Sequence, residues 1–232
     1  MRFLKVLKQK IGYLYYRWDE KTYEKFLRKK GIKIGENTYW GDVKTINIDT
    51  SRPSLVEIGN NVRIDTGMTI LTHDFPTWVF RQVYNDFVSS SGKVCIGDNV
   101  YCAQNVTILK NVTIGNNCII GFGSIVTKDI PPNSVVVGQP AKVISTLDEY
   151  YLKCKERVVE DAFSYAKSIE ERFNRSPKIA DFWEEFPLFM NGNELDKRLP
   201  IKKQLGSAYN HYLNNHKATF KDFDDFLEKI KK

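Results

Sequence analysis

The sequence predicts a mainly β protein: a parallel β-helix with a helical segment before it and a helical extension after it. From Ile96 onward an apolar residue opens each block of six residues: Ile96, Cys102, Ile108, Ile114, Ile120 and Val126. A second small or apolar residue follows four places after each of these: Val100, Val106, Val112, Cys118, Ser124 and Ile130. This period fits neither a helix nor one long strand, and it is typical of short strands joined by turns, three to a coil.

Repetition itself supplies the core of such a coil. The residues that open the blocks point inward and stack on those of the neighbouring coils. Glycine follows three of them, at Gly97, Gly115 and Gly121. Gly, Asn and Asp give the backbone the freedom that the corners need. The same spacing begins at Ile34, so residues 32–145 are expected to form the β-helix domain.

Two segments interrupt the six-residue period. Residues 49–56 leave the coil briefly, and the aromatic-rich loop 73–93 leaves it until Val94. Long loops inside a compact architecture are usually functional. The alternative is that loop 73–93 only fills a contact between subunits.

The basic charge of the chain lies in its first residues. The net charge is +7, and residues 1–31 carry ten Lys or Arg against three Asp or Glu. Apolar residues recur there at steps of three and four, which predicts an amphipathic helix over residues 3–30. This helix either makes peripheral contact with an anionic membrane or packs against the β-helix or a neighbouring subunit, and we favour packing. No nucleic-acid-binding motif accompanies the charge, so no nucleic-acid partner is expected.

The period stops at Thr146, and residues 146–232 are expected to form a C-terminal helical extension. Thr146 and Glu149 make a capping-box pattern at the start of a helical stripe that continues to Ile169. The stretch from Thr219 to Asp222 is a second candidate cap, before a last helix. These helices are expected to cover the open end of the coil, as the ends of solenoids require.

The stretch IGFGSIVTKDIPPNSVVVGQPAKVI resembles the terminal signature of the hexapeptide-repeat acyltransferases, which include galactoside, maltose and polysaccharide O-acetyltransferases. The resemblance implies that the β-helix is left-handed and that the donor is acetyl-coenzyme A (acetyl-CoA). It also implies a homotrimer, with the coenzyme in a groove between two subunits. The acceptor that it implies is a sugar or glycan.

His73 lies where the coil gives way to loop 73–93, and the resembling family has its catalytic base at this junction. Imidazole accepts a proton near neutral pH, and a hydroxyl that attacks a thioester must lose one. An isolated histidine is more often structural, but its position at the break in the repeat favours His73 as the base. The adjacent Asp74 is the candidate to orient its ring.

The resemblance also implies residues that bind the coenzyme: Tyr101, Ala103, Phe122, Thr127, Lys128 and Lys142. Ala103 and Phe122 fall near family positions that contact the pantetheine arm. Lys128 and Lys142 are suited to the coenzyme phosphates, and the alternative for both is solvated surface charge. Asn47, in an early coil, is the candidate substrate-binding residue.

Other sequence features limit the class of protein further. A catalytic zinc site needs about three protein ligands, and the coil offers one histidine, so no metal is expected. The four cysteines form no Cys-x-x-Cys pair and suit a reducing cytosol. The sequence contains neither a long apolar run nor the pattern of a signal peptide. These features predict a cytoplasmic protein, which would lie at the inner face of the membrane if the N-terminal helix binds lipid.

Taken together, the sequence favours an acetyl-CoA-dependent O-acetyltransferase that acts on a sugar hydroxyl, for example in capsule or lipopolysaccharide biosynthesis. Two alternatives remain open. The acceptor is an amine of an amino-sugar nucleotide, or a small antibiotic. Otherwise the β-helix is a non-catalytic scaffold that binds through its aromatic C-terminal extension.

Overall fold

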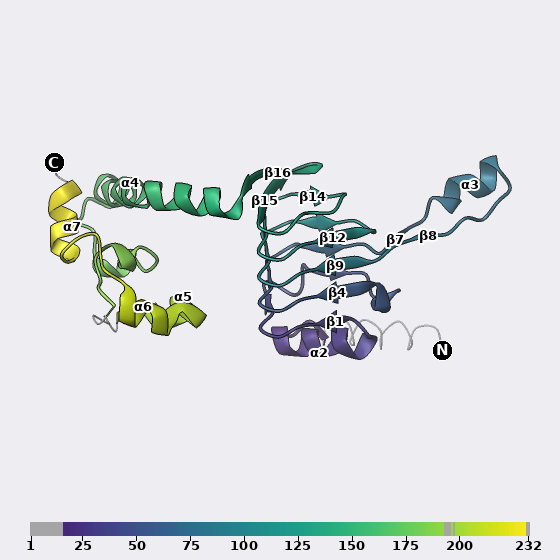
Figure 1. Cartoon of the computed structure of the whole chain (residues 1–232), viewed down its shortest axis with the longest axis horizontal. Coiled ribbons are helices and arrows are strands. Elements are labelled where there is room, and N and C mark those ends of the chain that lie inside the picture. The colour runs from purple at the N-terminus through teal and green to yellow at the C-terminus, as the bar shows by residue number, and fades with distance from the viewer. Residues whose placement is uncertain (1–15, 193–195, 197, 231–232) are drawn as a thin grey trace. The chain divides into compact units, whose positions relative to one another are not determined.

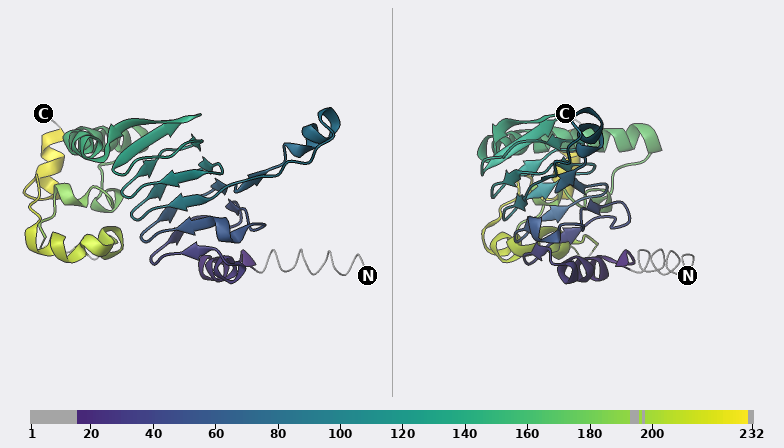
Figure 2. Two further views of the ribbon diagram at one scale, coloured as in Figure 1. Left: turned by 45° about the vertical axis from the view of Figure 1, so that its right-hand side comes forward. Right: turned by 90° about the vertical axis from the view of Figure 1, so that its right-hand side faces the viewer.

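The computed structural model describes residues 16–192, 196 and 198–230. The chain divides into two compact units, Met1–Tyr151 and Leu152–Lys232. The first unit is mainly β, with the strands of parallel sheets stacked coil on coil between α2 (Glu20–Lys30) and β16 (Ala141–Thr146) (Figure 1). The mainly β fold with parallel sheets that the six-residue period predicts is confirmed, and Figure 2 shows the stack from two further sides.

Three parallel sheets form the walls of this β-helix. Face A consists of β1 (Lys33–Ile34), β4 (Val56–Ile58), β9 (Val94–Ile96) and β12 (Val112–Ile114). Face B consists of β2 (Tyr39–Trp40), β5 (Arg63–Ile64), β10 (Tyr101–Cys102), β13 (Ile119–Ile120) and β15 (Ser134–Gly138), with β16 (Ala141–Thr146) added antiparallel. Face C consists of β3 (Asn47–Ile48), β6 (Thr69–Ile70), β11 (Thr107–Ile108) and β14 (Ile125–Val126). The chain visits faces A, B and C in turn, so one circuit is one coil.

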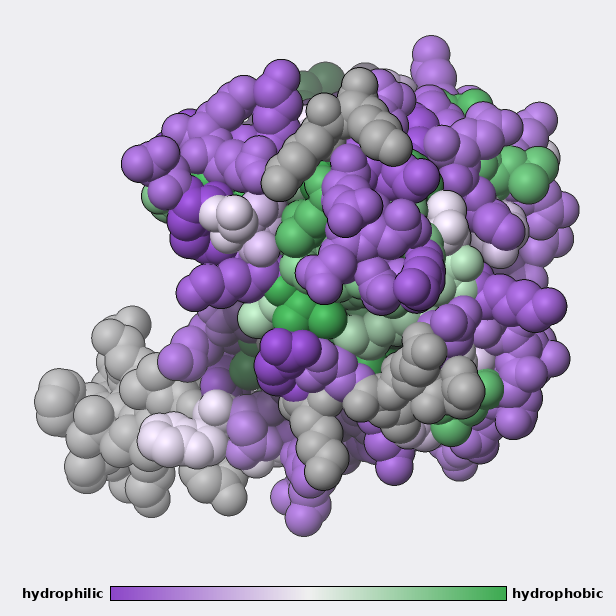
Figure 3. Space-filling view, turned by 90° about the vertical axis from the view of Figure 1, so that its left-hand side faces the viewer, coloured by the Kyte–Doolittle hydropathy of each residue, from purple (hydrophilic) through white to green (hydrophobic). Residues whose placement is uncertain are grey.

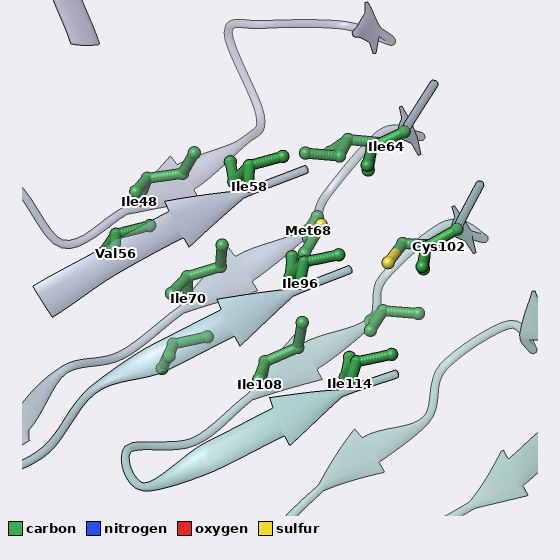
Figure 4. Close-up of a cluster of buried hydrophobic side chains, with 14 of the residues drawn as sticks. Ile48, Val56, Ile58, Ile64, Met68, Ile70, Ile96, Cys102, Ile108 and Ile114 are labelled. Atoms are coloured by element: carbon green, nitrogen blue, oxygen red, sulfur yellow. The ribbon is translucent and has the colours of Figure 1, made fainter. Parts of the chain in front are cut away.

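Aliphatic side chains stack in columns inside the coil. On face C, Ile48, Ile70 and Ile108 are paired in register from one coil to the next, and each is buried. Face A contributes a second column from Ile58, Ile96 and Ile114 (Figure 4). In the two-residue strands of the coil the first residue is exposed or half-buried and the second is buried, which places the repeat openers inside as predicted.

An asparagine ladder follows the corner between faces A and B. Its members, which all have φ between 53° and 58°, are Asn37, Asn61, Asn99, Asn117 and Asn133. The side-chain Nδ2 of each of the first four donates to the Oδ1 of the asparagine in the next coil, at 2.9–3.1 Å. Asparagine tolerates the left-handed backbone conformation better than most residues, so one residue type serves both the turn and the ladder.

Helix α2 (Glu20–Lys30) packs against the first coil. Tyr23 and Leu27 are buried in the core of the β-helix. The backbone N–H of Thr22 donates to the carboxylate of Asp19 at 2.8 Å, so Asp19 caps the helix. This corrects the prediction of one continuous helix over residues 3–30. The described helix begins at Glu20 because residues 17–19 form a turn and a cap, and residues 3–15 lie outside the described residues.

Two arginines attach the α2 region to backbone carbonyls of the first coil. Arg17 donates through Nη1 to the carbonyl oxygens of Val43 and Ile46, the latter at 2.7 Å. Arg28 donates to Ile34 and Gly35 at 2.5 and 2.6 Å. These contacts agree with the packed interpretation of the N-terminal segment over its described part.

Both predicted interruptions of the repeat leave the coil at the corner between faces C and A. The first contains a short 3₁₀-helix, η1 (Pro53–Leu55). The second is an arm, residues 73–91, in which β7 (His73–Asp74) pairs antiparallel with β8 (Ser90–Ser91) and carries α3 (Thr77–Val83) beyond them. Figure 1 shows this arm projecting from the stack.

The second unit is helical and has its own core. Its first helix, α4 (Leu147–Phe173), starts at the end of the first unit, where the predicted capping box of Thr146 and Glu149 is present with bonds of 2.8 and 3.2 Å. The other elements are η2 (Ile179–Asp181), η3 (Phe186–Leu188), α5 (Ile201–Leu205), η4 (Gly206–Ala208), α6 (Tyr209–Asn215) and α7 (Phe223–Ile230). Helix α7 starts at Phe223, and Asp222, the last residue of the predicted cap, accepts from the N–H of Asp225 at 2.8 Å.

Aromatic side chains pack together in this second unit. Phe182 and Phe226 are fully buried, with ring centroids 5.2 Å apart, and Phe189 contacts both rings. The aromatic cluster of the sequence therefore forms an internal core. On the side that Figure 3 shows, hydrophilic residues dominate the surface and hydrophobic residues form smaller patches between them. Within the described part of the chain, no helix is long and apolar enough to cross a membrane.

Candidate functional site

His73 and Asp49 meet at the corner between faces C and A. Strands β3 and β6 pair Ile48 with Ile70, so the residues that follow these strands lie in adjacent coils at one corner. The Oδ2 atom of Asp49 lies 2.5 Å from Nδ1 of His73. A carboxylate can only accept, so Nδ1 carries the ring proton and Nε2 keeps a lone pair. The arrangement can therefore accept a proton at Nε2.

A hydrogen-bond network holds the Asp49 carboxylate. Thr72 Oγ1 donates to it at 2.5 Å, and Ser51 donates through its backbone N and its hydroxyl at 2.9 and 2.7 Å. Burial of the carboxyl raises its pKa, but the bonds from Thr72, Ser51 and His73 outweigh burial and hold the pKa of Asp49 well below its usual range. The Asp49 side chain is 8% exposed and that of His73 is 35% exposed, so the carboxylate is covered while the ring stays accessible.

Contrary to the prediction, Asp74 does not contact the ring of His73. Its Oδ2 atom lies 2.5 Å from Nζ of Lys110, and the bonds from Lys110 and Ser90 lower the pKa of Asp74. Successive residues of a strand point to opposite sides, so Asp74 on β7 turns away from the side that His73 occupies. Asp49, which no sequence pattern singles out, takes the orienting position. The signal for it is that residues 49–56 and 73–93 leave the coil at one corner.

Most of the other predicted site residues border face C. Thr127 and Lys128 follow β14 and lie at the same corner as His73, two coils further on. Ala103 and Phe122 follow β10 and β13 at the opposite border, the corner between faces B and C. Ala103 is buried, whereas Phe122 is 69% exposed.

The outward side of face C carries no charged side chain. Its four residues are Asn47, Thr69, Thr107 and Ile125. Asn47 is exposed and precedes Asp49 by two residues, so it lies on this face close to the His73 corner. Face A, by contrast, presents Lys33 and Glu57. Face C and its two corners are the candidate functional site.

Tyr101 and Lys142 lie on face B instead. The Tyr101 hydroxyl donates to Asp65 at 2.9 Å, and Arg63 Nε donates to the same carboxylate at 3.0 Å. Partial burial and the bond to Asp65 raise the pKa of Tyr101. Lys142, on β16, is exposed like Lys128, and neither lysine forms an ion pair with another described residue.

Metal ligands are not grouped in the described residues. Residues 16–192, 196 and 198–230 contain no set of three or more His, Cys, Asp or Glu side chains arranged to hold a metal ion.

The β-helix of this chain is similar to known proteins. The model of the family described as bacterial transferase hexapeptide (six repeats) matches residues 94–128. Protein CapG of Staphylococcus aureus is 36% identical over 158 residues, which cover 66% of this chain and 82% of CapG. Galactoside O-acetyltransferase of Escherichia coli K12 is 40% identical over 126 residues, 53% of this chain and 59% of that enzyme. A solved maltose O-acetyltransferase from Clostridium difficile 630 is 32% identical, covers 55% of this chain and 76% of its own, and has a TM-score of 0.39.

The repeat and the relatives together define a class, the hexapeptide-repeat transferases. This chain belongs to the bacterial hexapeptide-repeat transferase family, because it is similar to CapG over four fifths of the length of that protein and matches the family model in its central repeats.

Proposed function

We propose that this protein transfers acetyl from acetyl-CoA to a hydroxyl group of a sugar, with His73 as general base. The observation that carries the proposal is the Asp49–His73 pair at the edge of the uncharged face C. The similarity to a galactoside O-acetyltransferase, of which the chain spans 59%, supports a sugar acceptor. A glycan of a capsule or lipopolysaccharide is the acceptor class that we favour, and the coil is taken to be left-handed as in the resembling family.

The mechanism that we propose is direct transfer between donor and acceptor. Nε2 of His73 removes the proton of the acceptor hydroxyl while the hydroxyl oxygen attacks the thioester carbonyl. The C–S bond then breaks, and the coenzyme sulfur leaves as the thiol with the proton that the imidazolium returns. Asp49 holds the ring by its Nδ1–H and stabilises the imidazolium that forms. Because Asp49 is already ionised and hydrogen-bonded before reaction, no rearrangement of this pair is needed.

Acetyl-CoA is the donor co-substrate in this proposal. Lys128 and Lys142 are exposed cations that suit its phosphates, and Thr127 lies beside Lys128. Phe122, on the other border of face C, offers an exposed apolar surface to the pantetheine arm. Face C is a flat wall with a corner at each side, so we infer that a second copy completes the groove in a homotrimer.

The test is thiol release from acetyl-CoA by the purified protein against a panel of sugars, amino sugars and small antibiotics. Acetylation of a sugar hydroxyl, identified by mass spectrometry and by its lability to mild base, is the expected result. Stable acetylation of an amine would replace the O-acetyl assignment. Binding of a glycan without thiol release from any donor would favour a non-catalytic scaffold.

A further inference from the structure

One side chain from another coil ties the two strands at the base of the arm together. Lys110 follows β11, so it lies at the corner of His73, one coil further on. Its Nζ atom donates to Asp74 on β7 and to Ser90 on β8. These two residues face each other in the β7–β8 pairing. A single ammonium group therefore bridges both strands of the arm and the body of the coil, and we name this contact the clasp.

The arm beyond the clasp carries a large apolar surface. Seven of its residues have exposed hydrophobic side chains, between 47% and 70%: Phe75, Trp78, Val79, Val83, Tyr84, Phe87 and Val88. The ladder that joins the arm to the coil is two residues long on each strand. Two pairs of residues constrain the orientation of the arm only weakly, so we expect the side-chain contacts at its base to contribute to where the apolar surface lies relative to His73.

The clasp and the Asp49 network hold opposite sides of one strand. His73 and Asp74 are consecutive in β7, and their side chains are held by Asp49 and by Lys110, respectively. The Lys110 side chain is 24% exposed and that of Asp74 is 56% exposed, so the clasp is shielded from solvent only on its Lys110 side. Its release would free the strand that carries His73 on one of its two sides.

We propose that Lys110 is a positioning residue for acetyl transfer: the clasp holds the arm at the His73 corner in the orientation in which the acceptor binds. The inference rests on the proposed function, because the acceptor is the group that meets His73. Lys110 acts through β7 and β8 and touches no reacting atom. Its loss is expected to weaken acceptor binding while leaving coenzyme binding unchanged.

Three variants test this role in the full-length protein: Lys110→Met, Lys110→Arg and Lys93→Met. Lys93→Met is the matched control, because it also removes a surface cation close to the arm in the sequence. Lys93 pairs with Glu57 at 2.9 Å and is not part of the clasp. Hydrogen exchange of the amides of residues 74–91 reports the clasp without any reaction. Acceptor KM, kcat and acetyl-CoA affinity report its effect on transfer.

In Lys110→Met we expect arm exchange to accelerate and acceptor KM to rise, each by about five- to tenfold, with acetyl-CoA affinity as in the wild type. In Lys110→Arg, arm exchange and acceptor KM should return most of the way to their wild-type values. In Lys93→Met, both should equal the wild-type values. Wild-type KM in an active Lys110→Met overturns the positioning role, and so does an equal effect in Lys93→Met. Absence of transferase activity in the wild-type protein would overturn the proposed function instead. If arm exchange were also unchanged in Lys110→Met, the claim that Lys110 holds the arm would fail as well.

Discussion

At the scale of single residues, the candidate site divides one task between two coils. Asp49 and His73 are 24 positions apart in the sequence and 2.5 Å apart in the structure. The parallel pairing of β3 with β6 creates this proximity, and the hydrogen bonds of Thr72 and Ser51 fix the carboxylate independently of His73. The carboxylate can therefore be altered without removing the ring, and the ring without removing the carboxylate.

Replacing His73 by Ala should reduce kcat by about 10²- to 10⁴-fold, which is the usual contribution of a general base. The coil should stay folded because the ring of His73 lies outside its core. Acetyl-CoA binding, measured by calorimetry, should match the wild type. A folded variant with near-wild-type kcat would make His73 a structural residue and end the proposed mechanism.

Asp49→Asn should reduce kcat by about 10²-fold or more, although it preserves size and shape. The Asn amide can donate to Nδ1, which moves the ring proton to Nε2 and leaves that atom unable to accept. Steady-state transfer under saturating acetyl-CoA measures the effect. Equal rates in Asp49→Asn and the wild type would show that the ring tautomer is set elsewhere.

The same substitution should alter the pH dependence of stability. The pKa of Asp49 is lower in the folded chain than in the unfolded chain, where a carboxyl titrates near ~3.9. Its contribution to the free energy of unfolding is therefore fully present above that pH and is lost as the pH falls toward the folded pKa. The stability difference between wild type and Asp49→Asn should shrink as the pH falls below about 4, as followed by denaturant unfolding. A difference that grows as the pH falls from about 4 toward 2 would contradict the assignment.

The sequence identifies one member of this pair and misses the other for a physical reason. His73 stands at the point where a strong period stops, which is visible in a linear pattern. Asp49 reaches His73 through the pairing of adjacent coils, and the insertion of residues 49–56 hides that pairing in the sequence. Adjacency in sequence pointed to Asp74, but alternation along β7 sends its side chain to Lys110.

At the scale of structural elements, the asparagine ladder joins the coils along the corner between faces A and B. Asn99 has φ 57° and bonds to Asn61 and Asn117. Asn99→Ala should lower the free energy of unfolding by about 2 kcal/mol, because it adds left-handed strain to the lost hydrogen bonds. Asn99→Gly removes the same bonds without the strain and should cost about 1 kcal/mol. Denaturant titration compares the two, and equal losses would exclude strain as a component.

The boundaries of strands that follow the six-residue repeat are predicted well from the sequence. The boundaries of helices that depend on one capping residue are predicted less well. The columns through Ile70 and Ile108 follow directly from the six-residue period. The start of α2 depends on the Asp19 carboxylate, and that of α7 on Asp222, and either cap outweighs the apolar spacing around it. The arm lies beyond prediction in detail, since its two strands pair over only two residues each.

At the scale of the whole molecule, we expect a homotrimer of about three times 26.9 kDa. Face C is uncharged, and exposed apolar residues occur at its border, at Phe122, and along the arm. Light scattering coupled to size-exclusion chromatography gives the mass directly. A fully active monomer would contradict the shared groove, whereas a trimer whose Phe122→Asp variant dissociates would support it.

Arg17 and Arg28, in the α2 region, also bond to backbone carbonyls of the first coil of the β-helix. Each coil donates backbone N–H groups to the coil above, as Gly35 does to Ile58 at 2.8 Å, so the first coil has carbonyls for which the described residues provide no coil below. Arg17 and Arg28 bond to four carbonyls of the first coil, and two of these, Ile34 and Ile46, correspond to the carbonyls of Ile58 and Met68 that accept from the coil below. An uncovered row of this kind is a template for strand addition by another molecule. The double variant Arg17→Ala and Arg28→Ala is therefore expected to polymerise end to end, which electron microscopy would detect. Particles of wild-type size would show that packing of the apolar side of α2 is enough to prevent strand addition at the first coil.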